Sequence, residues 1–299
     1  MSRPARNQRE DPGKDMMRTL RILLDNIKFQ HTIFALPFAY LGMVLAAGGL
    51  PTWGQAVWVT VAMASARTLA MSVNRVIDAE SDARNPRTAG RPLPRGLLSG
   101  RAVWLLAAVS LVVMLISAWL LNPLCLALSP LAIIVLVVYP YTKRFTWLSH
   151  AVLGLADGIA PMGGWIAVTG SFALETILLG GVVAAWVGGF DLIYACQDVE
   201  FDRREGLYSV PARFGIPAAL TLSIWTHVAG AALLAAVGWL MGLSWPFWAG
   251  WLITCGLLVY EHRLVEPDDL SRLNVAFFNI NGYIAVVVFV FTLASLYVR

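Results

Sequence analysis

The sequence predicts an all-α membrane protein, a single bundle of nine transmembrane helices. Hydrophobic residues make up 58% of the 299 residues, and only 13% are charged. The mean hydropathy is +0.68. Long apolar runs recur along the chain, and about 20 such residues are what an α-helix needs to cross the hydrocarbon core of a bilayer.

Hydropathy and helix-breaking residues delimit the nine segments. The first follows a basic stretch, but no small-residue cleavage site is evident and further spans follow, so we interpret it as a helix rather than a signal peptide. Cysteines occur singly and indicate no metal knuckle or redox pair. In chain order the segments are residues 30–48, 56–77, 102–121, 124–139, 148–168, 174–196, 216–240, 246–261 and 277–297.

The distribution of Lys and Arg predicts the orientation of the bundle. Of the 22 such residues, 19 precede the first segment or follow the second, fourth, sixth and eighth segments. The loops between, "AGGLPTWGQ", "LNP", "TGSF" and "MGLSWP", contain none. Because positive charge is retained in the cytoplasm, the N-terminus is predicted to be cytoplasmic and the C-terminus external. The net charge of +4 is thereby explained, and no nucleic-acid partner is indicated.

The sequence predicts two regions in the chain, a polar tail and a transmembrane domain. Residues 1–20 are polar and contain proline, so we predict a mobile cytoplasmic tail at the membrane surface. Residues 21–299 are predicted to form a single transmembrane domain.

A column of polar side chains is predicted at the cytoplasmic end of the second segment, in "NRVIDAESDARNPRTAGRPLPRG". Asn74, Asp78 and Asp82 are four residues apart, so on a helix they share one face. Glu80 lies between them and points away. A basic loop containing Pro and Gly follows.

The end of the sixth segment repeats this pattern in "FDLIYACQDVEFDRREG". Tyr194, Asp198 and Asp202 have the same spacing, Asp191 precedes Asp198 by one heptad, and Glu200 lies off the column. The basic loop "RREGLYSVPARFG" follows. We interpret the parallel as a duplication in which each half supplies one acidic helix end and one basic lid.

The two columns predict a site for a metal ion and a diphosphate. Carboxylates that face each other repel in a partly desolvated cleft unless cations lie between them. Carboxylate and amide oxygens without His or Cys suit Mg²⁺, which readily shares phosphate oxygens. The neighbouring Arg and Lys side chains suit the same phosphates. The alternative is a surface network of salt bridges at each helix end.

These motifs resemble those of the UbiA superfamily of intramembrane aromatic prenyltransferases. "NRVIDAESD" resembles the family pattern N-D-x-x-D-x-x-x-D, and "DVEFD" resembles its second D-x-x-x-D motif. "RTAGRPLPRG" is similar to the R-T-x-x-R-P-L-P loop. Arg67 and the "YPYTKR" loop also match, so the likeness covers residues 67–215.

The resemblance implies a central cavity and transfer of a polyprenyl group from its diphosphate to an aromatic ring carbon. It implies Mg²⁺ as the cofactor and acidic catalytic residues, with Asp191 and Tyr194 orienting the acceptor or assisting proton loss. The implied ligands of Mg²⁺ are Asn74, Asp78, Asp82, Asp198 and Asp202. The implied substrate-binding residues are Arg67, Arg87, Arg91, Tyr139, Lys143 and Arg144. The basic residues among them are implied to bind the diphosphate.

The aromatic acceptor implied by the resemblance is 4-hydroxybenzoate, with 1,4-dihydroxy-6-naphthoate as the alternative, in ubiquinone or menaquinone biosynthesis. The expected location is the cell inner membrane, with the active site facing the cytoplasm. An ion-coupled transporter is an alternative of a different class, but its acids would cluster near the midplane of the membrane rather than at helix ends.

The chain departs from the family pattern at two places. Arg75 replaces the acidic residue that usually follows Asn74, and because it lies off the column we expect the metal site to survive. The first helix lacks the R-P-x-G-like entry of bacterial 4-hydroxybenzoate enzymes, so Lys28 or His31 is a candidate to hold an acceptor carboxylate.

A few polar residues within the predicted spans have open roles. An arginine inside a membrane is costly and by default functional, which applies to Arg67. Asp157 either serves helix packing or marks a broken helix. Asn279 and Asn281 either bond across helices, which we favour, or line the cavity.

Overall fold

The computed structural model describes residues 22–27 and 29–298, which contain helices but no β-strand. Residues 1–20 and Lys28, named above, lie outside the described residues, as does the side chain of His31. Nine long helices within the described part coincide with the predicted segments, which confirms the all-α fold. They are α2 (Phe29–Ala47), α3 (Trp53–Ile77), α5 (Gly100–Leu121), α6 (Pro123–Thr142), α7 (Ser149–Thr169), α8 (Leu174–Ala195), α11 (Ile216–Leu240), α12 (Trp245–Arg263) and α13 (Asn281–Ser295).

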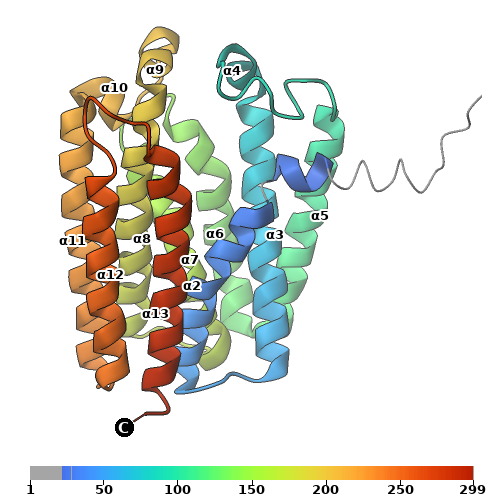
Figure 1. The fold of residues 1–299 in the computed structure, drawn as a ribbon. Coiled ribbons are helices and arrows are strands. Elements are labelled where there is room, and N and C mark those ends of the chain that lie inside the picture. The colour runs from blue at the N-terminus through green and yellow to red at the C-terminus, as the bar shows by residue number, and fades with distance from the viewer. Residues whose placement is uncertain (1–21, 28, 299) are drawn as a thin grey trace, which may run out of the picture.

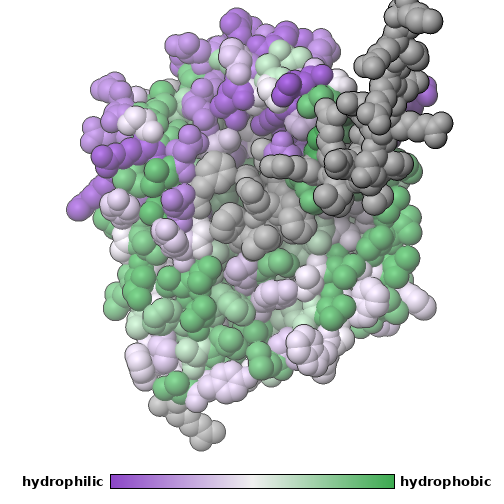
Figure 2. All heavy atoms as spheres, turned by 45° about the vertical axis from the view of Figure 1, so that its right-hand side comes forward, coloured by the Kyte–Doolittle hydropathy of each residue, from purple (hydrophilic) through white to green (hydrophobic). Residues whose placement is uncertain are grey.

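The outer surface of the bundle is that of a membrane protein. Within the described residues, seven helices are long and apolar enough to cross a membrane; α2 contributes the shorter apolar stretch Leu36–Ala47, and α12 is the ninth long helix. Large apolar side chains such as Trp119 and Leu105 are exposed on the outside. Figure 2 shows hydrophobic residues along the sides and hydrophilic residues gathered at one end.

The helices pack in an order that closes the bundle (Figure 1). α3 packs against α5 and α6. From α6 onward each long helix packs against the next one in the chain, in the order α6, α7, α8, α11, α12 and α13. α13 then contacts α2, which also packs against α3 and α7. The first and last of the long helices therefore lie side by side.

α7 approaches its neighbours closely because it carries glycine at the contacts. A Cβ atom on Gly154 would lie 2.2 Å from the carbonyl oxygen of Ala184 in α8, and one on Gly164 would lie 2.1 Å from that of Ala39 in α2. Small residues allow this approach in membrane helices, where packing rather than the hydrophobic effect drives association. α7 is thereby held against both α8 and α2.

Three short helices extend the polar end of the bundle (Figure 1). They are α4 (Ala79–Arg84), α9 (Val199–Glu205) and α10 (Val210–Phe214). α4 continues from α3, and α9 continues from α8 after the 3₁₀ turn η1 (Cys196–Asp198). Both acidic motifs therefore lie at the same end of the molecule.

The first acidic column is not on one continuous helix, which corrects the prediction. α3 ends at Ile77, whose carbonyl accepts a hydrogen bond from Arg144 Nη2 (2.9 Å), and Asp78 caps the helix with φ −92° and ψ 0°. The helical hydrogen bonds from Asp78 N to Asn74 O and from Asp82 N to Asp78 O persist at 2.9 and 2.7 Å. The three side chains therefore keep their four-residue register through the break.

The second acidic column is also interrupted. α8 ends at Ala195, and within η1 the side-chain nitrogen of Gln197 donates to the carbonyl of Tyr194 (3.0 Å). A 3₁₀ turn has three residues per turn rather than 3.6. Tyr194 and Asp198 are thus separated by a larger rotation than they would have on one α-helix.

α7 is unbroken, so Asp157 does not mark a broken helix. The helix runs from Ser149 to Thr169 and contains Pro161. A proline inside a helix is tolerated in membrane proteins where neighbouring groups compensate for the lost hydrogen bond.

Candidate active site

The first carboxylate of the first motif is bound by the loop after α6. Asp78 is buried, and its two oxygens lie 2.5 Å from Lys143 Nζ and 3.1 Å from Arg144 Nη2. Because Arg144 also binds the end of α3, the α6–α7 loop closes over the start of this motif.

The second carboxylate of this motif is bound from within its own loop. Arg91 Nη1 lies 2.7 and 2.6 Å from the two oxygens of Asp82. Arg75, at the position where the family pattern has an acid, is buried with Nη1 4.0 Å from Asp82, and its Nε donates to the carbonyl of Asn26 (2.9 Å). The departure from the family pattern thus places another positive charge beside this carboxylate.

In the second motif the two carboxylates have different partners. Asp198 accepts hydrogen bonds from Arg87, through Nε (2.9 Å) and Nη2, and from the side-chain nitrogen of Asn85 (3.0 Å). Asp202 accepts a hydrogen bond from Ser209 Oγ (2.8 Å). The loop that follows the first motif therefore binds a carboxylate of the second.

This exchange brings the two motifs together at one surface. Arg84 Nε in α4 lies 2.8 Å from Glu205 Oε2 in α9, so the two short helices are in direct contact. The sequence predicted one basic lid for each acidic helix end. It did not predict that the loop after the first motif closes on the second.

Arg87 connects this ion cluster to an aromatic ring. Its Nη1 donates to the hydroxyl of Tyr194 (3.0 Å), and its guanidinium carbon lies 5.3 Å from the centre of that ring. Burial disfavours the charge of Arg87, but the hydrogen bonds and charge of Asp198 outweigh this effect and raise its pKa. Arg87 is therefore a permanently charged side chain at the mouth of the site.

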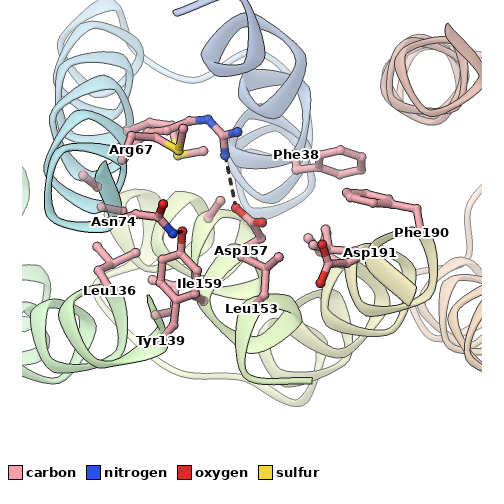
Figure 3. Close-up of a pocket in the computed structure, with 18 of the residues that line it drawn as sticks. Phe38, Arg67, Asn74, Leu136, Tyr139, Leu153, Asp157, Ile159, Phe190 and Asp191 are labelled. Atoms are coloured by element: carbon pink, nitrogen blue, oxygen red, sulfur yellow. Dashed lines mark hydrogen bonds and ion pairs between the residues drawn. The ribbon is translucent and has the colours of Figure 1, made fainter. Parts of the chain in front are cut away.

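A cavity of about 410 Å³ opens beside the ion cluster and is bounded mainly by α2, α3, α6, α7, α8 and α13. Its wall is mostly apolar, with Phe38, Leu136, Leu153, Ile159 and Phe190 among the lining side chains (Figure 3). The charged and polar lining residues include Arg67, Asn74, Arg75, Arg91, Tyr139, Asp157, Asp191, Tyr194 and Asn281.

Two pairs of polar residues in the cavity wall bind each other (Figure 3). Arg67 Nη1 lies 3.4 Å from Asp157 Oδ1. The side-chain nitrogen of Asn74 donates to the hydroxyl of Tyr139 (3.0 Å). Arg67 Nε is buried and has no hydrogen-bond partner among the described residues, so one donor of this guanidinium is unsatisfied.

A histidine that the sequence did not single out supports Asp191. His150 Nδ1 lies 2.7 Å from Asp191 Oδ2, and His150 Nε2 accepts a hydrogen bond from the backbone N–H of Val210 (3.3 Å). No other histidine lies four residues from His150 along the chain, so helical spacing gave no reason to select it. Only the packing of α7 against α8 reveals this pair.

Aromatic rings form one side of the cavity. The Tyr194 and Phe277 ring centres are 4.1 Å apart, those of Phe190 and Phe277 5.2 Å, and those of Phe38 and Trp186 4.6 Å. Such edge-to-face and tilted contacts are the favoured geometries of aromatic pairs. Of these rings, Tyr194 lies beside the ion cluster, where Arg87 contacts it.

Asn281 has both of the roles considered for it. It accepts a hydrogen bond from Trp186 Nε1 (2.6 Å), donates to Glu261 Oε1 (3.0 Å) and lines the cavity. Asn279 lies in the π-helical turn η2 (Val275–Ile280) and is exposed.

The donor set at the acidic motifs fits Mg²⁺ in one respect and not in another. Its carboxylate and amide oxygens are the hard ligands that this ion prefers. Among the described residues, however, no three His, Cys, Asp or Glu side chains converge closely enough to form a metal cage. Mg²⁺ commonly binds through one or two carboxylates together with substrate phosphates, so the donors present suit an ion that is shared with a diphosphate.

The structure brings the predicted site residues to one end of the bundle, at the acidic motifs or along the adjoining cavity. Sequence reasoning missed Asn85, His150 and Ser209, which bind Asp198, Asp191 and Asp202 respectively. Asn85 and Ser209 lie in the loops after the acidic motifs, which was a weak signal. No signal in the sequence identified His150.

Together these features define a membrane enzyme with paired acids and bases at the mouth of an apolar-walled cavity. The family model described as the UbiA prenyltransferase family matches residues 35–283. The chain belongs to this family and is a membrane prenyltransferase. This excludes the alternative of an ion-coupled transporter.

Similar proteins agree with this assignment. The chain is 31% identical over 258 residues to the 4-hydroxybenzoate octaprenyltransferase of Aliivibrio fischeri, covering 85% of this chain and 88% of that one. The apo structure of a UbiA homolog from Aeropyrum pernix K1 matches with a TM-score of 0.81 and 34% identity, over 89% of this chain and 98% of that one. A UbiA homolog from Archaeoglobus fulgidus bound to GPP and Mg²⁺ matches in fold, with a TM-score of 0.72, 20% identity and coverage of 93% and 100%.

Proposed function

We propose that this chain transfers a polyprenyl group from its diphosphate to a ring carbon of 4-hydroxybenzoate, in quinone biosynthesis. The observation that carries this proposal is the meeting of two acidic motifs and their basic partners at the mouth of one cavity with aromatic walls. The names of relatives that share about 30% of their residues with this chain support the choice of acceptor.

The diphosphate is assigned to the acidic end of the cavity. Asn74, Asp78, Asp82, Asp198 and Asp202 are the residues that would hold Mg²⁺. When bound there, Mg²⁺ supplies positive charge that stabilises the departing diphosphate. The name of the Archaeoglobus fulgidus structure, which holds GPP and Mg²⁺, supports this assignment.

The basic side chains of the loops bind the remaining diphosphate oxygens. Four basic side chains form ion pairs with motif carboxylates and so lie beside the assigned metal ligands: Arg87, Arg91, Lys143 and Arg144. Arginine and lysine bind phosphate oxygens through charge-assisted hydrogen bonds. Cleavage of the carbon–oxygen bond leaves an allylic cation, which the rings of Phe190, Tyr194 and Phe277 shelter from water by cation–π attraction.

The acceptor is assigned to the polar pairs deeper in the cavity. Arg67 lines the cavity, and its guanidinium suits a carboxylate, which takes two donors of one guanidinium in the same plane. This role differs from the diphosphate binding expected from the sequence, and it removes the need for Lys28 or His31. Tyr139, Asp157 and Asp191 present oxygens to the acceptor hydroxyl.

The site is assigned to the cytoplasmic face of the inner membrane. The positive loops and the acidic motifs occupy the same end of the bundle, and positive charge is retained in the cytoplasm. Water-soluble acceptors and diphosphate headgroups then reach the site from the cytoplasm, while the prenyl tail stays in the bilayer.

The test is prenyl transfer by the purified protein in detergent. Geranyl diphosphate and Mg²⁺ are supplied with 4-hydroxybenzoate or with 1,4-dihydroxy-6-naphthoate in separate reactions, and products are identified by mass. We expect prenylated 4-hydroxybenzoate that disappears with EDTA. A product from the naphthoate alone would replace the acceptor, and no product from either, also with a longer diphosphate, would contradict the proposal.

A further inference from the structure

The pair formed by His150 and Asp191 contributes to the cavity wall through Asp191. Asp191, on α8, retains 22% exposure of its side chain, whereas the His150 side chain, on α7, is 7% exposed. Figure 3 shows the Asp191 carboxylate at the wall of the cavity. His150 therefore reaches the cavity only through Asp191.

The hydrogen bonds of His150 determine which ring nitrogen carries the proton. The backbone N–H of Val210 can only donate, so Nε2, 3.3 Å away, must accept. Nδ1 then carries the proton in the neutral ring and donates it to Asp191 Oδ2 at 2.7 Å. This bond uses Oδ2, so Oδ1 is the other carboxylate oxygen of a residue that lines the cavity.

The segment that sets this tautomer also touches the rest of the site. The backbone N–H of Tyr208 donates to the carbonyl of Lys143 (2.7 Å), and Ser209 Oγ donates to Asp202 (2.8 Å). Val210, which follows, is buried at the start of α10. Three consecutive residues thus position the partner of Asp78, a motif carboxylate and His150.

We propose that His150 is a positioning residue for the aromatic acceptor and acts by orienting Asp191. This inference rests on the proposed function. The bond from the prenyl carbon to the diphosphate oxygen breaks first, and its electron pair leaves with the diphosphate. The ring carbon then bonds to the allylic cation while the acceptor hydroxyl gives its proton to Asp191 Oδ1. The substituted ring carbon then loses its proton to water, and Asp191 returns a proton to the oxygen, which restores the phenol.

The geometry favours this role over that of a histidine that only fills the core. A core histidine needs its two nitrogens satisfied, whereas this one is held by a backbone donor in the single tautomer that donates to a carboxylate at the cavity. A group that is oriented by a neighbour in this way loses activity when the neighbour is lost, even though the group itself remains.

The test compares four variants by steady-state kinetics with both substrates varied. His150→Leu removes the donor, and we expect the KM for the acceptor to rise on the order of 10- to 100-fold, or kcat to fall by a similar factor, with the KM for the diphosphate unchanged. His150→Asn keeps an N–H close to the Nδ1 position and restores activity. Asp191→Asn and the double variant with His150→Leu are equally impaired, because His150 acts through Asp191.

Two results would overturn the inference. One is an additive loss in the double variant, and the other is an equal rise of both KM values in His150→Leu. If His150→Leu does not fold, His150→Asn is compared with His150→Gln, whose amide reaches toward Val210 instead of Asp191; activity in Gln but not in Asn contradicts the role. We expect calorimetry without diphosphate or Mg²⁺ to rank the variants by acceptor affinity in the same order as the kinetics. Failure of the proposed function itself appears as wild-type protein that forms no product.

Discussion

At the scale of single residues, each motif carboxylate binds a side chain that lies outside its own helix. Lys143 and Arg144 bind Asp78, and Arg87 binds Asp198. Buried or half-buried carboxylates require such partners, because the cost of desolvating an unpaired charge exceeds what packing returns. The same cationic groups are suited to phosphate, so one set of side chains serves both the fold and the proposed chemistry.

The charge of the motif carboxylates is predicted to be essential for turnover, whereas the hydrogen bonds that an amide retains are predicted to suffice for folding. Asp78→Asn and Asp198→Asn keep side-chain volume and a hydrogen-bonding group but lose the charge that would hold Mg²⁺. We expect no detectable product, with unchanged insertion and elution in size-exclusion chromatography. Glu80→Gln is the matched control, because the Glu80 side chain is 88% exposed and lies off the column. Normal activity in either Asp variant at limiting Mg²⁺ would refute the assignment.

Arg67 is predicted to recognise the carboxylate of the acceptor. Arg67→Gln removes a charge-assisted hydrogen bond worth about 1.5 to 3 kcal/mol, so we expect the KM for 4-hydroxybenzoate to rise by roughly 10- to 100-fold. Phenol, which lacks the carboxylate, serves as the control acceptor and should be used equally well by both proteins. A selective rise in the KM for the diphosphate would instead place Arg67 at the other substrate.

At the scale of elements, glycines set the distance between α7 and its neighbours. Gly154 in α7 meets the backbone of Ala184, whereas a Cβ on Gly163, in the same helix, would have no atom within 4 Å. The position of α7 matters for the site because this helix carries both His150 and Asp157.

Gly154→Ala is predicted to destabilise the protein, with Gly163→Ala as the matched control. The new methyl of Gly154→Ala forces α7 and α8 apart, and such overpacking typically costs about 1 to 3 kcal/mol. Gly163→Ala gains helix propensity of about 1 kcal/mol without a clash. Thermal unfolding in detergent should show a lower melting temperature only for Gly154→Ala. Equal melting temperatures would mean that the contact tolerates a methyl group.

At the scale of the whole molecule, hydrophilic residues gather at one end of the bundle (Figure 2). The polar end carries α4, α9 and α10 with the two acidic motifs, and the sides are apolar (Figures 1 and 2). We predict that a bundle with this distribution inserts with its basic loops in the cytoplasm.

The orientation is tested by labelling single cysteines from outside the cell. In a variant without Cys125, Cys196 and Cys255, Ser171→Cys places a thiol between α7 and α8, and Glu266→Cys places one between α12 and η2; both positions are exposed. An impermeant maleimide should label Ser171→Cys in spheroplasts and Glu266→Cys only after lysis. The reverse pattern would put the site on the outer face.

The sequence by itself determined the membrane class, the nine long helices and the four-residue register of the first acidic column. Hydropathy and helical periodicity are local properties, so they can be read from neighbouring residues. It also indicated the chemistry of the site, because the acids and bases are clustered along the chain. It missed the breaks at Asp78 and Asp198, where side chains from elsewhere bind helix carbonyls or carboxylates.

Only the tertiary structure decided which groups meet. Arg87 and Asp198 are 111 residues apart, and His150 and Asp191 are 41 residues apart. Contacts over such separations depend on which helices pack together and at what rotation, and neither is encoded in local spacing. The cavity, the partner of Arg67 and the orientation of Asp191 are therefore consequences of the packing of α3, α7 and α8.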